Sequence, residues 1–581
     1  YENDGSESFT EHAISTSANG AQFVHAADVD GDGDMDVLSA SYIDDKIAWY
    51  ENDGSQGFTE YVISTSADAA NSVYAIDIDG DGDMDVLSAS SWDNKIAWYE
   101  NYIPGPTDVS GVISSNTTWS ALSSPYIVTG NVLVNEGVTL TIQAGVEVKF
   151  DVGNSIQING ELIAQGTSSN KITFTSNQSS PAAGDWDGIK FTESSVDASY
   201  NDISDTYSGG SILSNCVVEY GGYNLNGVIE ITNAHPFIQN STITNNGATG
   251  IYCYDDFSGN PRYEGNTIAY NSYSDQSYGG GIWMQCVKSF KINNNLFYNN
   301  TSSTNGGAIR SYCMTGTDFE INNNIFVSNN SENNVGGGAI YVAINNGGSI
   351  VDITKNTFIG NLSNQNGKNV SINNGTSAKI NFLNNLLSTK YDSSINSQIY
   401  ANGIHASDDF IITNNNYLPV QLESGFDYAL RNNTGISVDA KSNYWGTTTD
   451  SDIQSLIYDW NDDGSLGIVD YSLYLTTPNT DAPISPPANV AKQASGGNVI
   501  LTWDANPESD VAGYKIHYGN FTGYSYTTNT DLGNVTTYTL SGVSIDSSIA
   551  ITAYDGNIDG TDDQVEGYQS WFATAIIPPY S

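Results

Sequence analysis

The sequence predicts an all-β protein in which a long parallel β-solenoid lies between two smaller β domains. Three observations support this prediction. A segment near the start recurs with an offset of 49 residues, Asn residues recur about every 29 residues through the middle, and short alternating strands follow at even spacing near the end. Because 581 residues are too many for one hydrophobic core, several domains are expected.

Composition and charge exclude several classes of protein. Asp and Glu number 66 against 17 Lys and Arg, which gives a formal net charge of -49. A surface of this charge repels nucleic acid and anionic membranes and favours divalent cations as counter-ions. Only 14% of the residues are charged and 57 are Gly, which is typical of turn-rich β structure rather than of a disordered acidic tail. No apolar run approaches the roughly 20 residues of a membrane span, so we expect none.

The N-terminal repeat predicts two propeller-type blades. Residues 1–47 recur as residues 50–96, and a period of this length with short strands and Gly turns is typical of a propeller blade. A propeller closes with roughly four to eight blades, so we expect either further blades upstream of Tyr1 or packing against another element. The first residues are not a signal peptide, so we expect the chain to start after processing or to be a fragment.

Each repeat contains a nine-residue acidic loop with Asp at every second position and Gly at the sixth. Alternate positions in a tight turn let the carboxylates converge, and clustered carboxylates repel one another unless a cation lies between them. We therefore predict Ca2+ in both loops, and the alternative is a solvated acidic turn without metal. The predicted ligands are Asp28, Asp30, Asp32, Asp34 and Asp36 in the first loop and Asp77, Asp79, Asp81, Asp83 and Asp85 in the second.

These repeats resemble the FG-GAP/VCBS repeats of bacterial surface proteins and integrin heads, over residues 1 to about 100. The resemblance implies that the calcium is structural, so no enzymatic role follows from it. We assign residues 1–104 to this domain and expect it to be part of a larger array.

Asn residues mark the coils of the central region. Gly-rich turns recur in step with them, and one coil of about 29 residues explains both periods. Strands of successive coils then stack in parallel about 4.8 Å apart, so stacked Asn side chains should form a hydrogen-bonded ladder. The Asn residues that set this period are Asn240, Asn266, Asn295, Asn324, Asn356 and Asn385.

The same stacking predicts an outward column of aromatic side chains. If Ile251, Ile282, Ile309 and Ile340 share one inward position, the residue after each of them shares one outward position. Exposed aromatic side chains at sheet spacing can stack on the sugar rings of a polysaccharide. The alternative is that aromatic residues suit outward β positions or lie beneath a long loop. The predicted carbohydrate-binding residues are Tyr252, Trp283, Arg310 and Tyr341, with Tyr312 in the column beside them.

Four Cys residues are too few for a disulfide framework in a chain of this size. The register stacks Cys286 on Cys313 in an inward row, where neighbouring strands are close enough for a disulfide. A buried thiol pair is equally consistent with this position, so both alternatives stay open.

The central region contains three further motifs, Gly137-Val-Thr-Leu-Thr-Ile-Gln-Ala-Gly-Val146, Trp186-Asp-Gly-Ile189 and a closing Asn443-Tyr-Trp-Gly-Thr447. These motifs resemble those of the right-handed parallel β-helices of the pectate-lyase-like class. The resemblance covers about residues 107–480 and implies this fold for a domain at 105–480, but a fold alone does not imply a function. The complete prediction is a right-handed parallel β-helix flanked by N-terminal propeller-type repeats and a C-terminal β-sandwich.

Enzymes of the pectate-lyase-like class divide into lyases and hydrolases. The resemblance implies that a hydrolase would carry a Gly-His-Gly and an Arg-x-Lys, and the sequence has neither. A lyase would pair carboxylates with an Arg or Lys base, and Arg310 with Asp255, Asp256 and Glu264 could form such a set if all reached one proton. We expect no catalysis, and the alternative is a calcium-dependent polysaccharide lyase or a glycoside hydrolase.

A different acidic loop lies near the end of the solenoid. Its oxygen-bearing residues stand at positions 1, 3, 5 and 12 with Gly464 at position 6, which is the spacing of an EF-hand loop. Calcium binding and a capping turn on the solenoid end remain alternatives. The metal ligands would be Asp459, Asn461, Asp463 and Asp470.

The C-terminal region, residues 481–581, follows a Pro-rich linker. Its strands, including Val499–Trp503, Tyr514–Tyr518 and Ile549–Tyr554, resemble those of a fibronectin type III domain with Trp503 as the core aromatic residue. Such modules usually space or dock other domains.

Taken as a whole, the sequence favours a secreted or cell-surface bacterial protein that is stabilised by calcium and binds glycans or neighbouring surface-protein subunits. The enzyme described above is one alternative. A structural subunit of an extracellular filament is another, because solenoids and sandwich modules can pack in series.

Overall fold

The computed structural model divides the chain into two compact units, Tyr1–Gly105 (unit 1) and Pro106–Ser581 (unit 2). It describes residues 2–3, 9–30, 34–55, 57–78, 84–101, 106–201, 203–255, 259–273, 280–285, 289–313, 318–332, 336–344, 348–364, 366–375, 378–388, 397–403, 410–418, 428–556 and 569–578. None of the helices in these ranges is both long enough and apolar enough to span a bilayer.

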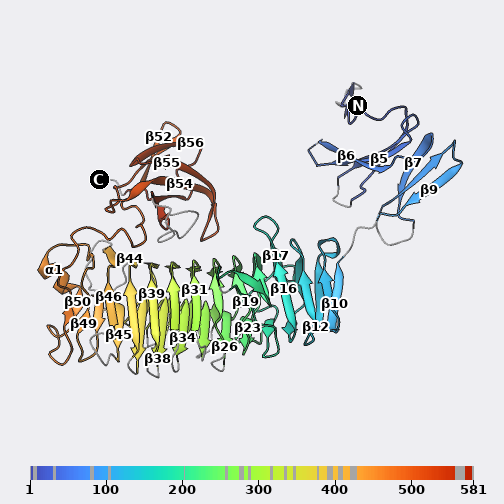
Figure 1. Cartoon of the computed structure of the whole chain (residues 1–581). Coiled ribbons are helices and arrows are strands. Elements are labelled where there is room, and N and C mark those ends of the chain that lie inside the picture. The colour runs from blue at the N-terminus through green and yellow to red at the C-terminus, as the bar shows by residue number, and fades with distance from the viewer. Residues whose placement is uncertain are drawn as a thin grey trace. The chain divides into compact units, whose positions relative to one another are not determined.

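The described part of unit 1 contains two larger antiparallel sheets, and the first extends from the first repeat into the start of the second (Figure 1). The two sheets share one register, because Val37 pairs with Tyr50 in the first and Val86 pairs with Tyr99 in the second. The first sheet contains β3 (Ala21–Ala27), β4 (Asp36–Ser41), β5 (Lys46–Asn52) and β6 (Phe58–Ser64), and the second contains β7 (Ala70–Ile76), β8 (Asp85–Ser90) and β9 (Lys95–Tyr99). A short hairpin of β1 (Glu2–Asn3) and β2 (Phe9–Thr10) precedes them. Assignment of these sheets to a propeller stays a prediction.

Unit 2 begins with a parallel β-solenoid whose strands stack in three columns, here called faces A, B and C (Figure 1). Face A contains β10 (Thr107–Ile113), β12 (Tyr126–Val134), β15 (Ser155–Ile158), β18 (Gly188–Phe191), β23 (Gly227–Thr232), β26 (Thr249–Tyr254), β30 (Ile282–Gln285), β34 (Ile309–Cys313), β38 (Ile340–Ile344), β42 (Val370–Asn374), β45 (Ser397–Asn402), β48 (Tyr428–Asn432) and β50 (Ile457–Tyr458). This arrangement confirms the predicted parallel β-helix.

Faces B and C complete each coil. Face B shares β12 and continues through β14 (Glu147–Phe150), β17 (Ile172–Ser176), β22 (Cys216–Glu219), β25 (Thr242–Thr244), β28 (Thr267–Ala269), β32 (Leu296–Tyr298), β36 (Ile325–Val327), β40 (Thr357–Ile359), β44 (Leu386–Ser388) and β47 (Asn416–Leu418). Face C contains β11 (Thr117–Trp119), β13 (Thr139–Ile142), β16 (Glu161–Gln165), β21 (Ile212–Ser214), β24 (Phe237–Gln239), β27 (Arg262–Glu264), β31 (Ser289–Asn293), β35 (Asp318–Asn322), β39 (Ile350–Thr354), β43 (Lys379–Leu383), β46 (Phe410–Thr413), β49 (Val438–Asp439) and β51 (Val469–Asp470).

Shorter elements fill the corners between the faces. A four-stranded sheet runs along one corner, a hairpin projects beside face C, and one turn of 3-10 helix and one short α-helix lie near the two ends of the solenoid. These elements are β29 (Ser272–Tyr273), β33 (Thr301–Ser302), β37 (Asn330–Ser331) and β41 (Leu362–Ser363); the hairpin of β19 (Ser199–Tyr200) and β20 (Tyr207–Gly209); η1 (Ala121–Ser123); and α1 (Asp450–Ser455).

The solenoid interior is a continuous apolar core. Alternate side chains of each strand point inward, and like residues stack on like residues because the coils are in register. Phe297, Phe326 and Phe358 of face B, for example, stack with ring centroids 4.9 and 5.0 Å apart. At the far end Trp445 is fully buried and stacks on Tyr417 at 4.6 Å, so the closing motif seen in the sequence covers the last coils of the core.

A ladder of buried Asn side chains runs along the solenoid, as predicted. In each rung from Asn295 onward, the side-chain Oδ1 accepts hydrogen bonds from both the backbone N–H and the side-chain Nδ2 of the Asn one coil earlier, as Asn324 does from Asn295 at 2.9 and 3.0 Å. The same Nδ2 also donates to a backbone carbonyl, that of Tyr263 in the case of Asn295. The ladder consists of Asn266, Asn295, Asn324, Asn356, Asn385, Asn415 and Asn443.

The first predicted rung was wrong. Asn240 is exposed with a φ of 49°, so it serves as a turn residue, and the adjacent Ser241 takes the rung by donating its backbone N–H to Asn266. A second, unpredicted ladder runs along another corner. Its rungs are joined by amide hydrogen bonds of 2.8 to 3.0 Å and consist of Asn246, Asn271, Asn300, Asn329 and Asn361.

The C-terminal part of unit 2 forms two antiparallel sheets around a common core. The three-stranded sheet contains β52 (Ala491–Ser495), β53 (Asn498–Thr502) and β56 (Thr537–Ser541), and the four-stranded sheet contains β55 (Tyr526–Gly533), β54 (Val511–Phe521), β57 (Ile549–Asp555) and β58 (Ala573–Thr574). Trp503 is buried in this core with its ring edge-on to Tyr514. The fibronectin type III identity of this part stays a prediction.

A small apolar cluster joins these sheets to the solenoid. Trp571 is buried against outward side chains of face B, namely Leu296, Ile325 and Val327. Tyr298 lies beside them, 5.8 Å from the Trp571 ring. The cluster shows that part of face B is covered by the chain itself, whereas face A is not involved in it.

Replacing Asn324 with Ala should lower the unfolding free energy of the solenoid by about 1–3 kcal/mol, because the amide groups of Asn295 and Asn356 would lose buried partners. Thermal or denaturant unfolding of the full chain measures this loss. Asn170→Ala, at an exposed turn of the same solenoid, is the matched control and should change little. Equal effects of the two substitutions would contradict a stabilising ladder.

Candidate metal centre and candidate binding face

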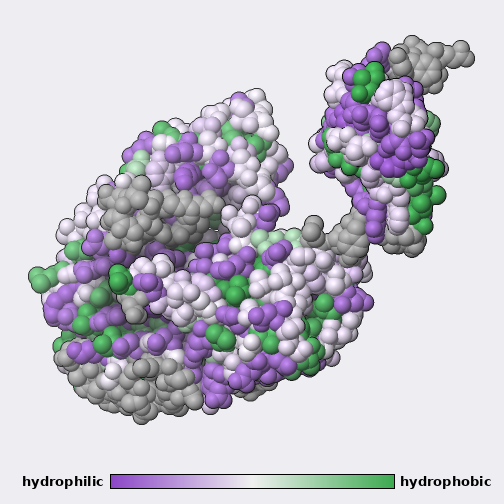
Figure 2. All heavy atoms as spheres, turned by 45° about the vertical axis from the view of Figure 1, so that its right-hand side comes forward, coloured by the Kyte–Doolittle hydropathy of each residue, from purple (hydrophilic) through white to green (hydrophobic). Residues whose placement is uncertain are grey.

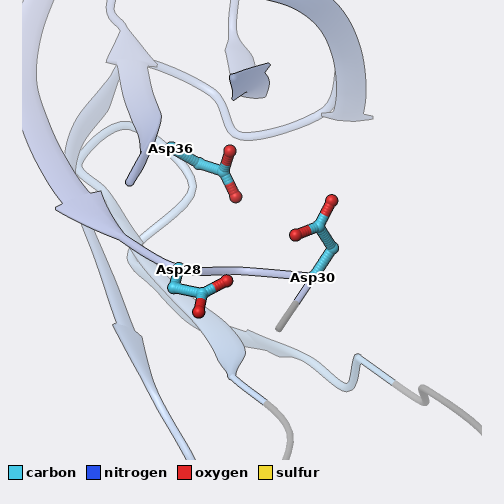
Figure 3. A group of neighbouring side chains, drawn as sticks. All are labelled: Asp28, Asp30 and Asp36. Atoms are coloured by element: carbon cyan, nitrogen blue, oxygen red, sulfur yellow. The ribbon is translucent and has the colours of Figure 1, made fainter. Parts of the chain in front are cut away.

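The first acidic loop of unit 1 brings three carboxylates together. Asp28, Asp30 and Asp36 each offer an oxygen within 4.8 Å of the others, and the three side chains point toward one another (Figure 3). Asp28 and Asp30 are half-buried and Asp36 is fully buried. Oxygen donors of this kind suit a hard cation such as Ca2+, so these three residues could hold one.

Asp36 also has a role in the fold of the loop. Its Oδ2 accepts the backbone N–H of Val29 at 3.0 Å, and its Oδ1 accepts that of Asn52 at 2.8 Å. Asp85 does the same in the second repeat, with Ile78 at 3.1 Å and Asn101 at 2.8 Å. Burial opposes ionisation of Asp85, but these hydrogen bonds and one from Trp98 outweigh it and lower its pKa. The ninth position of each loop therefore ties the loop ends together.

The rest of the predicted calcium set is only partly described. Asp34 and Asp77 are half-buried. Asp32, Asp79, Asp81 and Asp83 lie outside the described residues.

The acidic loop near the end of the solenoid has a different geometry. Asp459 is fully buried, and its two oxygens accept backbone N–H groups from Asn461 and Val469, each at 2.9 Å. The Asp463 carboxylate accepts a hydrogen bond from the Ser465 hydroxyl, and the Asp470 carboxylate forms an ion pair with Lys441 at 2.9 Å. Among the described residues, three metal-ligating oxygens lie within 4.8 Å of one another in the unit 1 group and not in this loop. The contacts of Asp459 are those of a capping turn.

The predicted outward column lies on face A in the expected register. Tyr252 pairs with Trp283, Trp283 with Arg310, and Arg310 with Tyr341. The side chains are less accessible than expected, with exposures of 9%, 4%, 7% and 4% in that order. Part of this burial is mutual, because the Tyr252 and Trp283 rings stack face to face at 4.5 Å.

Residues beside the column complete its packing. Arg310 donates to the Thr304 hydroxyl at 2.8 Å and to the hydroxyl of Tyr312, and its guanidinium lies over the Tyr312 ring. Tyr312 is half-buried, and Tyr254, two coils earlier in the same row, is exposed. The accessible aromatic surface here therefore belongs to the neighbouring row.

The column continues beyond the four predicted residues. The sequence analysis did not predict this extension. Tyr341 pairs with Ser371, and the register then runs through further aromatic and Arg residues that are half-buried rather than buried. The Arg431 guanidinium lies 4.2 Å from the centre of the Tyr458 ring. The full set, here called the aromatic column, is Tyr252, Trp283, Arg310, Tyr341, Ser371, Tyr400, Arg431 and Tyr458. The sequence could have indicated this extension, because each of its last three members directly follows an inward apolar residue, namely Ile399, Leu430 or Ile457.

The candidate lyase residues are not gathered at one point. Glu264 lies on β27 of face C, whereas Arg310 lies on β34 of face A. Asp255 accepts the Gly259 N–H at 2.9 Å and lies 3.2 Å from His235. Asp256 is outside the described residues.

The predicted pairing of two cysteines is not described either. Cys286 lies outside the described residues, and the side chain of Cys313 is not described.

His235 is held between two carboxylates that lie far from it in the sequence. Its Nδ1 lies 3.0 Å from Asp197 and its Nε2 lies 3.2 Å from the buried Asp255. Burial alone would lower the pKa of the imidazole, but the two carboxylates raise it to about 9. The charged imidazole therefore links the segments before β19, before β24 and after β26.

Comparison with known proteins gives two partial matches. Residues 28–88 match an FG-GAP-like repeat. Residues 111–234 match a pectate-lyase-like β-helix domain. The FG-GAP-like match contains the three converging carboxylates, and the β-helix match ends before the aromatic column begins, so it bears on the fold and not on that column. No curated protein matched the chain. FG-GAP-like repeats together with such a β-helix fit an extracellular adhesive or glycan-related role.

The His235 bridge should make solenoid stability depend on pH. Its folded pKa of about 9 exceeds the ordinary value of 6.5, so its stabilisation is complete below about pH 6.5 and is lost as the pH rises through about 9. His235→Gln should therefore cost roughly 1–3 kcal/mol at pH 6 and much less at pH 10. Unfolding of wild type and variant across this range measures the difference, and a pH-independent gap would exclude the bridge as its source.

Proposed function

We propose that the protein is a secreted or cell-surface adhesive protein that binds glycans along face A, is stabilised by calcium in unit 1, and performs no catalysis. The aromatic column is the observation that supports this proposal most directly. It repeats one outward position over eight successive strands of face A, at the roughly 4.8 Å spacing of stacked strands.

A long glycan suits a surface of this kind. Aromatic rings can stack on sugar rings, and Arg beside Tyr can donate hydrogen bonds to hydroxyl groups. The most accessible rings are those of Tyr254, Tyr312, Tyr400 and Tyr458. The buried Trp283 supports the surface from below instead of contacting a ligand. Because the chain carries a formal charge of -49, neutral or metal-bridged glycans fit better than free polyuronates.

The contacts of Arg310 and the position of Glu264 favour binding over cleavage. Arg310, which would act as the lyase base, donates to Thr304 and Tyr312, and Glu264 lies on another face of the solenoid. The match to a pectate-lyase-like domain concerns a fold that is compatible with many functions.

The glycan proposal is tested with a polysaccharide array and the double variant Tyr254→Ala/Tyr400→Ala. Each lost ring should weaken retention about tenfold, on the order of 1.4 kcal/mol, while the melting temperature stays close to that of wild type. Tyr223→Ala, an exposed Tyr outside face A, is the control. Unchanged retention in the double variant would remove face A as the binding surface. Release of unsaturated sugars by the wild type would instead identify a lyase.

Calcium in unit 1 is tested by chelation. EDTA should lower the melting temperature of unit 1 within the full chain, because a cation that binds only the folded state stabilises by about 2.7 kcal/mol at a hundredfold excess over its Kd. Asp28→Asn/Asp30→Asn should abolish the response to EDTA, and Glu11→Gln, an exposed acidic control, should retain it. An identical response in both variants would exclude the converging carboxylates as the site.

A further inference from the structure

A pocket of 140 Å3 lies at the junction of the two repeats of unit 1. The Asn101 side chain ties this junction together, because its Nδ2 donates to the Val29 carbonyl at 2.9 Å and to the Met84 carbonyl at 3.2 Å. The pocket has about ten times the volume that one water molecule needs, so it has room for part of a larger ligand. The lining residues that bear on its chemistry are Asp30, Trp49, Ile63, Val86, Tyr99 and Glu100.

The walls of the pocket are mostly apolar. The Trp49 and Tyr99 rings are both half-buried, and Ile63 and the buried Val86 complete the apolar lining. The Trp49 ring is held in place by stacking on Tyr61, with ring centroids 4.9 Å apart. Figure 2 shows apolar side chains between polar ones on the visible surface of unit 1, the smaller body. Rings held in this way offer a flat apolar surface to a ligand.

The Trp49 indole also carries a hydrogen-bond donor that lacks an acceptor. Within the described part of the chain, its Nε1 is buried and has no hydrogen-bond partner. Its counterpart in the second repeat, Trp98, donates to the Asp85 carboxylate. A buried donor without an acceptor is destabilising, so a ligand that brings an oxygen to this N–H gains binding energy from it.

Two carboxylates at the pocket restrict the ligand further. Glu100 is exposed and Asp30 is half-buried, and their negative charge repels an anion. A simple cation cannot accept the Trp49 N–H, and a hydrocarbon satisfies neither the N–H nor the carboxylates. Hydroxyl groups both accept and donate hydrogen bonds, and a sugar ring also has an apolar face that suits aromatic rings. Asp30 belongs to the converging carboxylates as well, so Glu100 is the acceptor assigned to the ligand.

We propose that this pocket binds one neutral sugar unit, whose apolar face lies on Trp49 and Tyr99. One sugar oxygen accepts the Trp49 N–H, and one sugar hydroxyl donates to the Glu100 carboxylate. Trp49 comes from β5 and Tyr99 from β9, so the binding unit is a pair of successive repeats. The site uses no residue of face A and is therefore a second glycan site that does not depend on the first.

Saturation-transfer NMR of the full chain with free monosaccharides tests the proposal. The probes are glucose, galactose, mannose and N-acetylglucosamine, and at least one should receive saturation from the wild type. Trp49→Phe keeps an aromatic ring but removes the N–H, and it should weaken binding about tenfold. Glu100→Gln, at an exposed side chain, should also weaken binding because a charged acceptor is lost. Trp92→Phe, at an exposed Trp of unit 1, is the control and should bind like the wild type.

The face A variant separates this site from the first one. Tyr254→Ala/Tyr400→Ala should bind the monosaccharides as the wild type does. No transfer to any probe from the wild type, or undiminished transfer in both Trp49→Phe and Glu100→Gln, would overturn the sugar pocket. Transfer that is lost only in the face A variant would overturn it too, while supporting the function proposed above.

Discussion

The stacking of coils in a parallel solenoid depends on satisfying the backbone and side-chain polar groups at its buried corners. From Asn295 to Asn415 in the first Asn ladder, and at Asn300 and Asn329 in the second, one amide oxygen accepts two N–H groups from the coil before it, and the amide nitrogen donates to the next rung and to a carbonyl. An unsatisfied amide at this depth would cost about 1–3 kcal/mol, so the ladders strongly favour one register. The Phe stacks of the core, the aromatic column of face A and the His235 bridge all require that register.

Much of this architecture could be predicted because a register, once set, determines many neighbours. Aligning four Ile residues was sufficient to pair Tyr252, Trp283, Arg310 and Tyr341 correctly. The Asn period predicted the rungs of the first ladder from Asn266 to Asn385 but not Asn415 and Asn443. It also placed a rung at Asn240, where a left-handed turn moves the rung by one residue. The second ladder, from Asn246 to Asn361, was missed because the Asn-rich sequence offers many competing alignments.

Accessibility and partner choice could not be predicted in the same way. The spacing of Asp459, Asn461, Asp463 and Asp470 suits a metal, but which donors reach each carboxylate depends on how the chain folds over the solenoid end. The burial of Trp283 depends in part on its stacking with Tyr252, which the spacing of the inward Ile residues does not predict. The contacts of His235 could not be predicted, because Asp197 and Asp255 lie far from it in the chain and meet it only through the coil geometry.

The one-way bonding of the ladders has an evolutionary consequence. Each rung receives from one neighbour and gives to the other, so inserting or deleting a whole coil leaves the bonding of the remaining rungs intact. Inserting half a coil would leave amides facing apolar side chains. Selection can thus change the length of the molecule in steps of one coil, and with it the reach of face A, without redesigning either end.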